Sequence, residues 1–203
     1  MSLFFLLNPF RSSVQCENCN KKPNMNPISP NIEPIEVKPI EEPKIESNVI
    51  QELDINLSQH FTLRELVTTS HREIDNRPSP EIVERLKILA LDFLEPIRLK
   101  FGPIRINSGY RCPTLNTAIG GAKESAHKYG CAADLIPLDK RFTTTDVVRW
   151  IVDESGLDYD QVIDEGSSTA FWVHIGLRRP GFEKKARQQA LIFRNGTYTN
   201  WVG

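Results

Sequence analysis

The sequence predicts an α+β domain in which helices pack on one side of a small antiparallel sheet. Two observations support this fold class. Apolar residues recur at helical spacing early in residues 53–203, and short runs rich in Ile, Val and aromatic residues follow later. Helices that come first and strands that come afterwards favour segregated elements over a parallel sheet with alternating crossovers.

The first two helices carry recognisable start signals. Thr62 and Glu65 form a capping box that begins a short helix, while Ser79 and Pro80 give a longer helix an N-cap and a first-turn proline. Apolar positions in the longer helix recur three or four residues apart, which indicates one face packed on a core. Pro96 should kink or end this helix, because proline has no amide hydrogen to donate.

The second half of the domain holds the candidate strands, with a helix predicted at residues 144–154. Five apolar runs separated by turn residues have the length and composition of strands. These runs are IRINSGYR (104–111), CAADLIPL (131–138), QVIDE (161–165), AFWVHIGL (170–177) and ALIFR (190–194).

Residues 1–52 have a different character and are predicted to form a flexible, proline-rich tail or linker before the domain at 53–203. Six prolines between positions 23 and 43 prevent a regular helix, and little apolar surface is available to bury. The opening MSLFFLLNPFRSS has only a short apolar run with no basic residue before it, so no signal peptide is expected. No stretch has the roughly 18–20 apolar residues of a membrane span.

Charge and cysteine content exclude two protein classes. The formal net charge of −1 provides no general attraction to nucleic acid, so a nucleic-acid partner is not expected. Four cysteines are too few for a disulfide scaffold, and Cys16 and Cys19 have no second pair at zinc-ribbon spacing. We expect Cys112 and Cys131 to be small buried residues.

Three residues are candidate metal ligands. His127 lies in the loop ESAHKYG, Asp134 in the strand CAADL and His174 in the strand FWVHIGL. A catalytic zinc takes three such ligands and leaves a fourth position for water. The alternative is a surface loop together with an ordinary core histidine. His60 and His71 lie among polar residues and are expected to be solvated, without partners.

Two residues between the first strand and this loop also suggest a role. Arg111 follows a predicted strand, where its guanidinium could clamp a carboxylate or polarise a carbonyl. An exposed arginine in contact with water is the alternative. Asn116 could cap or staple the turn that follows it.

The segment SGYRCPTLNTAIGGAKESAHKYGCAADL, followed by WVHIGL, resembles the zinc D-alanyl-D-alanine carboxypeptidase family of cell-wall metallopeptidases. Its front part, LSQHFTLRELV and NRPSPEIVERL, is similar to the phage and prophage branch. The resemblance implies a Hedgehog/D-Ala-D-Ala-peptidase-like fold and Zn²⁺ bound by His127, Asp134 and His174. It also implies that Arg111 binds the substrate's carbonyl or carboxylate and that Ser125 orients the substrate or the loop.

The general base departs from the family pattern. Many relatives place an acid three residues before the last histidine, or a second histidine two before it, but here Phe171 and Trp172 stand there. The nearest carboxylates are Asp164 and Glu165. Strand alternation places Glu165 on the face of Ile163 and Asp164 on the other. The phage-type branch resembles this Q-x-I-x-E arrangement, so Glu165 is the predicted base.

The resemblance implies a zinc-dependent hydrolase that cleaves D-Ala-D-Ala or L-Ala-D-Glu bonds in peptidoglycan stem peptides, as a carboxypeptidase or an endopeptidase. Without a signal peptide, such an enzyme would be made in the cytoplasm. It would reach the cell wall after lysis, as a phage endolysin, or as part of a virion, with the tail contacting virion proteins. A non-catalytic structural or peptidoglycan-binding virion protein is the main alternative, and a cytoplasmic D,D-dipeptidase is a third reading.

Overall fold

A computed structural model describes residues 53–181 and 185–202 of the chain. The predicted tail at 1–52, including Cys16 and Cys19, lies outside the described residues. Helices are α2 (Leu63–Val67), α3 (Pro80–Leu89), α4 (Glu95–Phe101), α5 (Pro113–Ala118) and α6 (Thr144–Asp153), with a π-helical turn η1 (Ala90–Leu94) and a 3-10 turn η2 (Ala126–Tyr129). Strands are β1 (Ile104–Ser108), β2 (Ala132–Pro137), β3 (Gln161–Gly166), β4 (Phe171–Gly176), β5 (Gln189–Arg194) and β6 (Thr197–Asn200).

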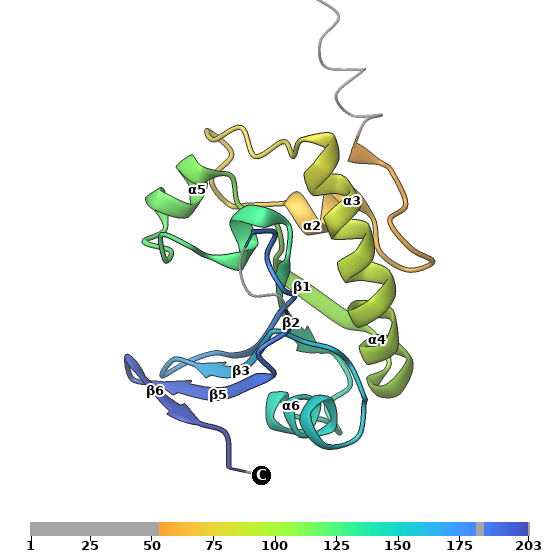
Figure 1. The fold of residues 1–203 in the computed structure, drawn as a ribbon, viewed down its shortest axis with the longest axis vertical. Helices are drawn as coiled ribbons and strands as arrows, with labels where there is room; N and C mark the ends of the chain where they lie inside the picture. Colours follow the sequence, from red (N-terminus) through yellow and green to blue (C-terminus); the bar gives the residue numbers. More distant parts are fainter. Residues whose placement is uncertain (1–52, 182–184, 203) are drawn as a thin grey trace, which may run out of the picture. The chain divides into compact units, whose positions relative to one another are not determined.

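The predicted α+β class is confirmed, and the sheet is mixed rather than wholly antiparallel. Its order is β1-β2-β4-β3-β5-β6, and only the β3–β5 pair is parallel among the described strands (Figure 1). The chain leaves the β3–β4 hairpin and returns on the far side of β3, so that β5 runs in the direction of β3. Every side chain of β6 is exposed, which explains why apolar patterning did not predict that strand.

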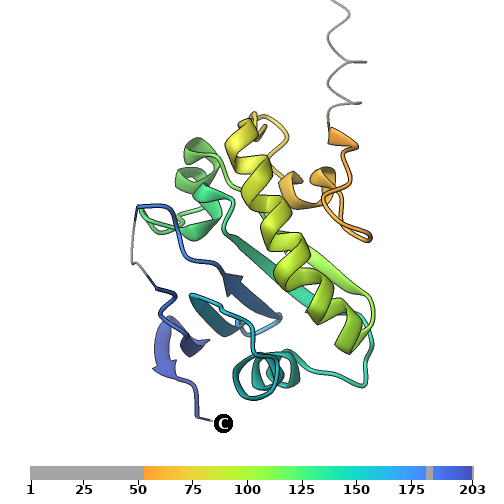
Figure 2. The same cartoon turned by 45° about the vertical axis from the view of Figure 1, so that its right-hand side comes forward.

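Both predicted helix starts are present. Thr62 and Glu65 form the capping box of α2, and Ser79 is the N-cap of α3 with Pro80 in its first turn. Pro96 does not end the long helix, because the chain continues through η1 into α4 as far as Phe101. The π-helical turn lies directly before this proline, where its wider backbone accommodates a residue that cannot donate an amide hydrogen bond. Figure 2 shows this long helix lying across β1 and β2.

Alternation along the strands gives the sheet one packed face and one open face. Leu135, Val162 and Ile175 belong to a single apolar cluster that also contains residues of α3, α4 and α6. The helices therefore cover this face, as predicted. The residues that alternate with them, including Asp134 and His174, point to the other face. Asp134 and His174 thus lie on the side of the central strands that the long helices leave open.

The two cysteines and the helix lengths of the described domain also agree with the sequence-based expectations. Cys112 and Cys131 are buried and free, as predicted, and Cys112 accepts a hydrogen bond from the Leu115 amide at the start of α5. Within residues 53–181 and 185–202, every helix is too short or too polar to span a bilayer.

Candidate functional site

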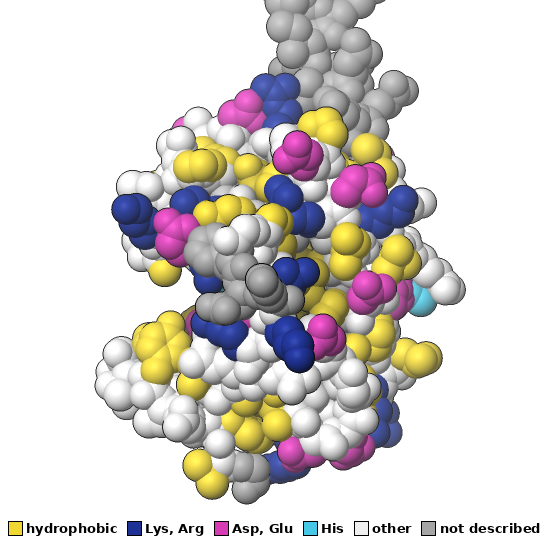
Figure 3. Space-filling model, in the orientation of Figure 1, with side chains coloured by type: hydrophobic (Ala, Val, Ile, Leu, Met, Phe, Trp, Pro, Cys, Tyr) yellow, Lys and Arg dark blue, Asp and Glu magenta, His cyan; other side chains and the backbone are white. Residues whose placement is uncertain are grey.

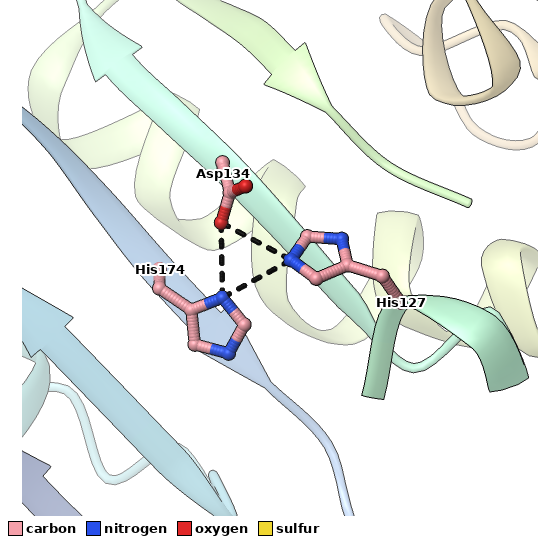
Figure 4. A group of neighbouring side chains, drawn as sticks. All are labelled: His127, Asp134 and His174. Carbon is pink, nitrogen blue, oxygen red and sulfur yellow. Dashed lines mark hydrogen bonds and ion pairs between the residues drawn. The ribbon is translucent and has the colours of Figure 1, made fainter. Parts of the chain in front are cut away.

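The three candidate metal ligands meet on the open face of the sheet (Figure 4). Asp134 on β2 and His174 on β4 are direct cross-strand partners, and His127 reaches them from η2. His127 Nε2 lies 3.2 Å from Asp134 Oδ1 and 3.2 Å from His174 Nδ1, while the last two atoms are 2.9 Å apart. All three side chains are buried. Residues 47 positions apart in the chain thus form one compact triangle of donor atoms.

His127 is in its neutral form, and its unprotonated nitrogen points into the triangle. Its Nδ1 lies 2.6 Å from the Gly109 carbonyl oxygen, which can only accept, so Nδ1 carries the proton and Nε2 a bare lone pair. Burial lowers the pKa of His127 and favours this neutral form. A lone pair therefore faces a carboxylate oxygen, an arrangement that a bound cation would stabilise.

The size and chemistry of the triangle fit zinc. Tetrahedral coordination with bonds of about 2.0–2.1 Å requires ligand atoms about 3.3 Å apart. The observed separations of 2.9 and 3.2 Å are close to that value. Two imidazole nitrogens and one carboxylate oxygen are a donor set that zinc accepts, and the cleft in front of them has room for a fourth ligand.

The segment between β1 and α5, which supplies the Gly109 carbonyl, is held in place by features that sequence reasoning missed. Gly109 passes so close to α2 that a Cβ there would lie 2.3 Å from the Leu66 carbonyl oxygen, so a larger residue would displace the carbonyl that orients His127. Asn76 is buried and donates to the carbonyls of Val67 and Tyr110 at 2.8 and 3.0 Å. No local pattern marks either residue, because their partners are distant in sequence.

Arg111 lies against the metal-ligand triangle rather than in solvent. Its Nη2 is 2.5 Å from Asp134 Oδ2, and its Nε donates to Ser108 Oγ at 2.8 Å. Ser108 is the cross-strand partner of Asp134. A β-bulge between Ile106 and Ser108 changes the direction of the end of β1. The exposed-arginine alternative is therefore wrong. One oxygen of Asp134 faces the histidines while Arg111 holds the other.

The loop between α5 and η2 forms one wall of the site. Asn116 Nδ2 donates to the Ala122 carbonyl at 3.0 Å, so it staples this loop as the sequence suggested. Ser125 begins η2, and its side chain makes no capping bond. Gly130 ends η2 in the left-handed conformation with φ of 67°, which lets the chain turn directly into β2.

Glu165 and Asp164 have different surroundings. Asp164 is buried on the helix-covered face, where the hydroxyls of Thr144 and Thr145 donate to it at 2.9 and 2.7 Å. Glu165 lies on the open face beside the triangle and bonds the Trp172 side chain. Burial, followed by the charge of Asp134, raises the pKa of Glu165. The Asp164 side chain is thus held by hydrogen bonds within the protein. Of these two carboxylates, Glu165 is the one that a ligand in the cleft can reach.

A cleft of about 490 Å³ gives a substrate access to the site. Its lining includes the three triangle residues together with Arg111, Ser125 and Glu165. Arg179 and Arg187 line the same cleft. In the view of Figure 3, Lys and Arg side chains gather around the middle of the molecule. Arg179 donates to the Glu124 carbonyl, and Arg187 pairs with the buried Asp160 at 2.7 Å. The cleft therefore combines cationic groups with the carboxylates near the triangle.

The side chains of the other two histidines, His60 and His71, are 39% and 40% exposed, in agreement with the prediction that they are solvated, but the prediction that they have no partners is wrong. His60 Nδ1 lies 2.7 Å from Glu95 Oε2, and His71 Nδ1 lies 3.0 Å from Glu73 Oε1. Glu95 is 35 positions from His60, which is why local sequence did not reveal that pair. Neither histidine lines the cleft.

Comparison with known proteins gives one clear match. The family model described as Peptidase M15 matches residues 59–162, which include His127 and Asp134. His174 lies beyond the matched range, on the strand that pairs with β2. No curated protein matches the chain.

Proposed function

The chain belongs to the peptidase M15 family of metallopeptidases, and on that premise we propose that it is a zinc peptidase hydrolysing peptide bonds in peptidoglycan stem peptides. The bonds proposed are of the D-Ala-D-Ala or L-Ala-D-Glu type. The observation that carries the proposal is the triangle of His127, Asp134 and His174, which has the dimensions of a zinc site and opens into a cleft. The three side chains are the proposed zinc ligands.

Each residue around the triangle has a proposed chemical role. Bound zinc would polarise the scissile carbonyl and lower the pKa of a water toward neutrality. Glu165 accepts the proton of the attacking water and passes it to the leaving amine, as a general base and then a general acid. Arg111 presents positive charge to the oxygen on which negative charge develops. Ser125 contacts the substrate from the wall of the cleft. This chemistry needs no covalent intermediate.

Arg111 also has a positioning role that can be measured without turnover. We expect Arg111→Lys to weaken zinc binding about tenfold or more, because lysine keeps the charge but cannot hold Ser108 and Asp134 Oδ2 together. Competition of the protein with a chromophoric chelator measures this affinity. An unchanged zinc affinity in the variant would show that Arg111 does not hold the ligand in place.

We further propose that the enzyme acts at the bacterial cell wall, after lysis or as part of a virion. The support is the similarity of residues 57–67 and 76–86 to the phage and prophage branch.

A non-catalytic, peptidoglycan-binding protein is the second candidate function. It is favoured by Phe171 and Trp172, which occupy positions where many relatives have a proton-accepting group. Glu165 in the cleft favours the enzyme instead, because it supplies a carboxylate beside the triangle. Catalytic turnover separates the two functions.

Metal removal tests the proposed activity. A synthetic stem pentapeptide that contains both an L-Ala-D-Glu and a D-Ala-D-Ala bond should be cleaved by the full-length protein. Dialysis against a chelator should reduce the rate to background, and about one equivalent of zinc per chain should restore it. Mass spectrometry of the products identifies the bond. A zinc-loaded protein that binds the pentapeptide and leaves both bonds intact would favour the non-catalytic function.

A further inference from the structure

A row of four side chains crosses the open face next to the proposed zinc ligands. Trp172 on β4 pairs with Glu165 on β3, Glu165 pairs with Phe193 on β5, and Phe193 pairs with Tyr198 on β6. Cross-strand partners point to the same face of a sheet. The proposed base is therefore flanked by aromatic residues on both sides. Phe193 and Tyr198 lie outside the residues that match the family model.

Tyr198 leans from the edge of the sheet toward the site. In the strand order, β6 is four places from β2, which in a flat sheet would separate the two by about 19 Å. Tyr198 nevertheless lines the same cleft as Asp134 and Arg111. Burial, followed by the charges of Glu165 and Asp134, raises the pKa of Tyr198. The Tyr198 side chain thus forms the wall of the cleft on the Glu165 side.

The Tyr198 side chain is both held and accessible. Its ring packs on Phe193 with the ring centroids 4.5 Å apart, and 56% of the residue is exposed. A ring fixed by a neighbour presents its hydroxyl at little cost in side-chain entropy. A phenol whose pKa is raised by burial stays protonated at neutral pH, so the hydroxyl is a neutral hydrogen-bond donor.

We propose that the Tyr198 hydroxyl donates a hydrogen bond to a carbonyl oxygen of the bound stem peptide, on the Glu165 side of the cleft. This inference rests on the proposed function, since the acceptors of a peptide backbone are its carbonyl oxygens. Tyr198 is thus a residue for substrate binding, contributed by a strand that the family match does not include. Phe193 sets the position of its ring.

Tyr198→Phe tests the hydroxyl, because it keeps the ring and its packing on Phe193. With the synthetic stem pentapeptide we expect KM to rise about threefold to tenfold, the effect of losing one hydrogen bond to a neutral acceptor. Since the bond forms in the ground state as well, kcat should stay within about twofold of wild type. Zinc content should be unchanged. Thr199→Val is the matched control, because it removes a hydroxyl from the same strand on the opposite face and should leave KM unchanged.

Equilibrium binding separates failure of this inference from failure of the proposed function. In the zinc-loaded Glu165→Gln background, adding Tyr198→Phe should raise the Kd of the pentapeptide by a similar factor. If the wild type shows no turnover but this Kd rises, the contact stands and the peptidase proposal fails. Unchanged KM and Kd in Tyr198→Phe, or no detectable pentapeptide binding, would overturn the contact. A wild-type Kd for Tyr198→Phe with weak binding only for Tyr198→Ala would assign the role to the ring and also overturn it.

Discussion

Replacing Glu165 with glutamine is expected to lower kcat for stem-peptide hydrolysis by about 10²–10⁴-fold while zinc content stays the same. Glutamine keeps the size of the side chain and can still bond Trp172, but it cannot accept a proton at neutral pH. Steady-state kinetics on the synthetic pentapeptide, with metal analysis of the same preparation, measure both quantities.

Asp164→Asn is the control for this prediction, because Asp164 is the adjacent carboxylate. Its side chain is held on the opposite face by Thr144, Thr145 and Arg194, so the variant should lower the unfolding temperature and leave kcat of the folded protein near wild type. Full activity in Glu165→Gln, or a larger loss of kcat in Asp164→Asn than in Glu165→Gln, would remove Glu165 from the role of base.

The second large effect is expected for His127→Ala, which should abolish stoichiometric zinc binding and with it hydrolysis of the pentapeptide. The change removes one of the three ligand atoms, and the two that remain cannot form a catalytic zinc site. Elemental analysis by mass spectrometry after exhaustive dialysis gives the zinc content per chain.

His60→Ala provides the matched control for His127→Ala. His60 pairs with Glu95 and lies outside the cleft, so its removal should leave zinc content and activity unchanged. If His127→Ala bound as much zinc as wild type, the ligand assignment would fail. If both variants lost zinc, the loss would reflect general damage to the fold.

The parts of the fold and the site that depend on local pattern could be predicted from the sequence. Alternation along residues 161–165 correctly separated Glu165 from Asp164, because the side-chain period of a strand is independent of its partners. The capping box of Thr62 and Glu65 similarly fixed the start of α2. In each case the signal and the structure lie within a few residues of each other.

The parts that were missed depend on partners distant in the chain. Arg111 contacts Asp134 Oδ2 from 23 positions away, and the Gly109 carbonyl contacts His127 Nδ1 from 18 positions away. The parallel pairing of β3 with β5 joins residues 28 positions apart, such as Gln161 and Gln189. The all-exposed strand β6, with Tyr198, has no apolar pattern to reveal it.

The most direct test of the central claim is a crystal structure of the zinc-loaded protein with anomalous data collected at the zinc edge. The proposed site predicts one strong anomalous peak about 2.0–2.2 Å from His127 Nε2, Asp134 Oδ1 and His174 Nδ1, with the fourth position facing the cleft. A zinc peak that lacks any of these three ligands, or that lies elsewhere in the chain, would contradict it.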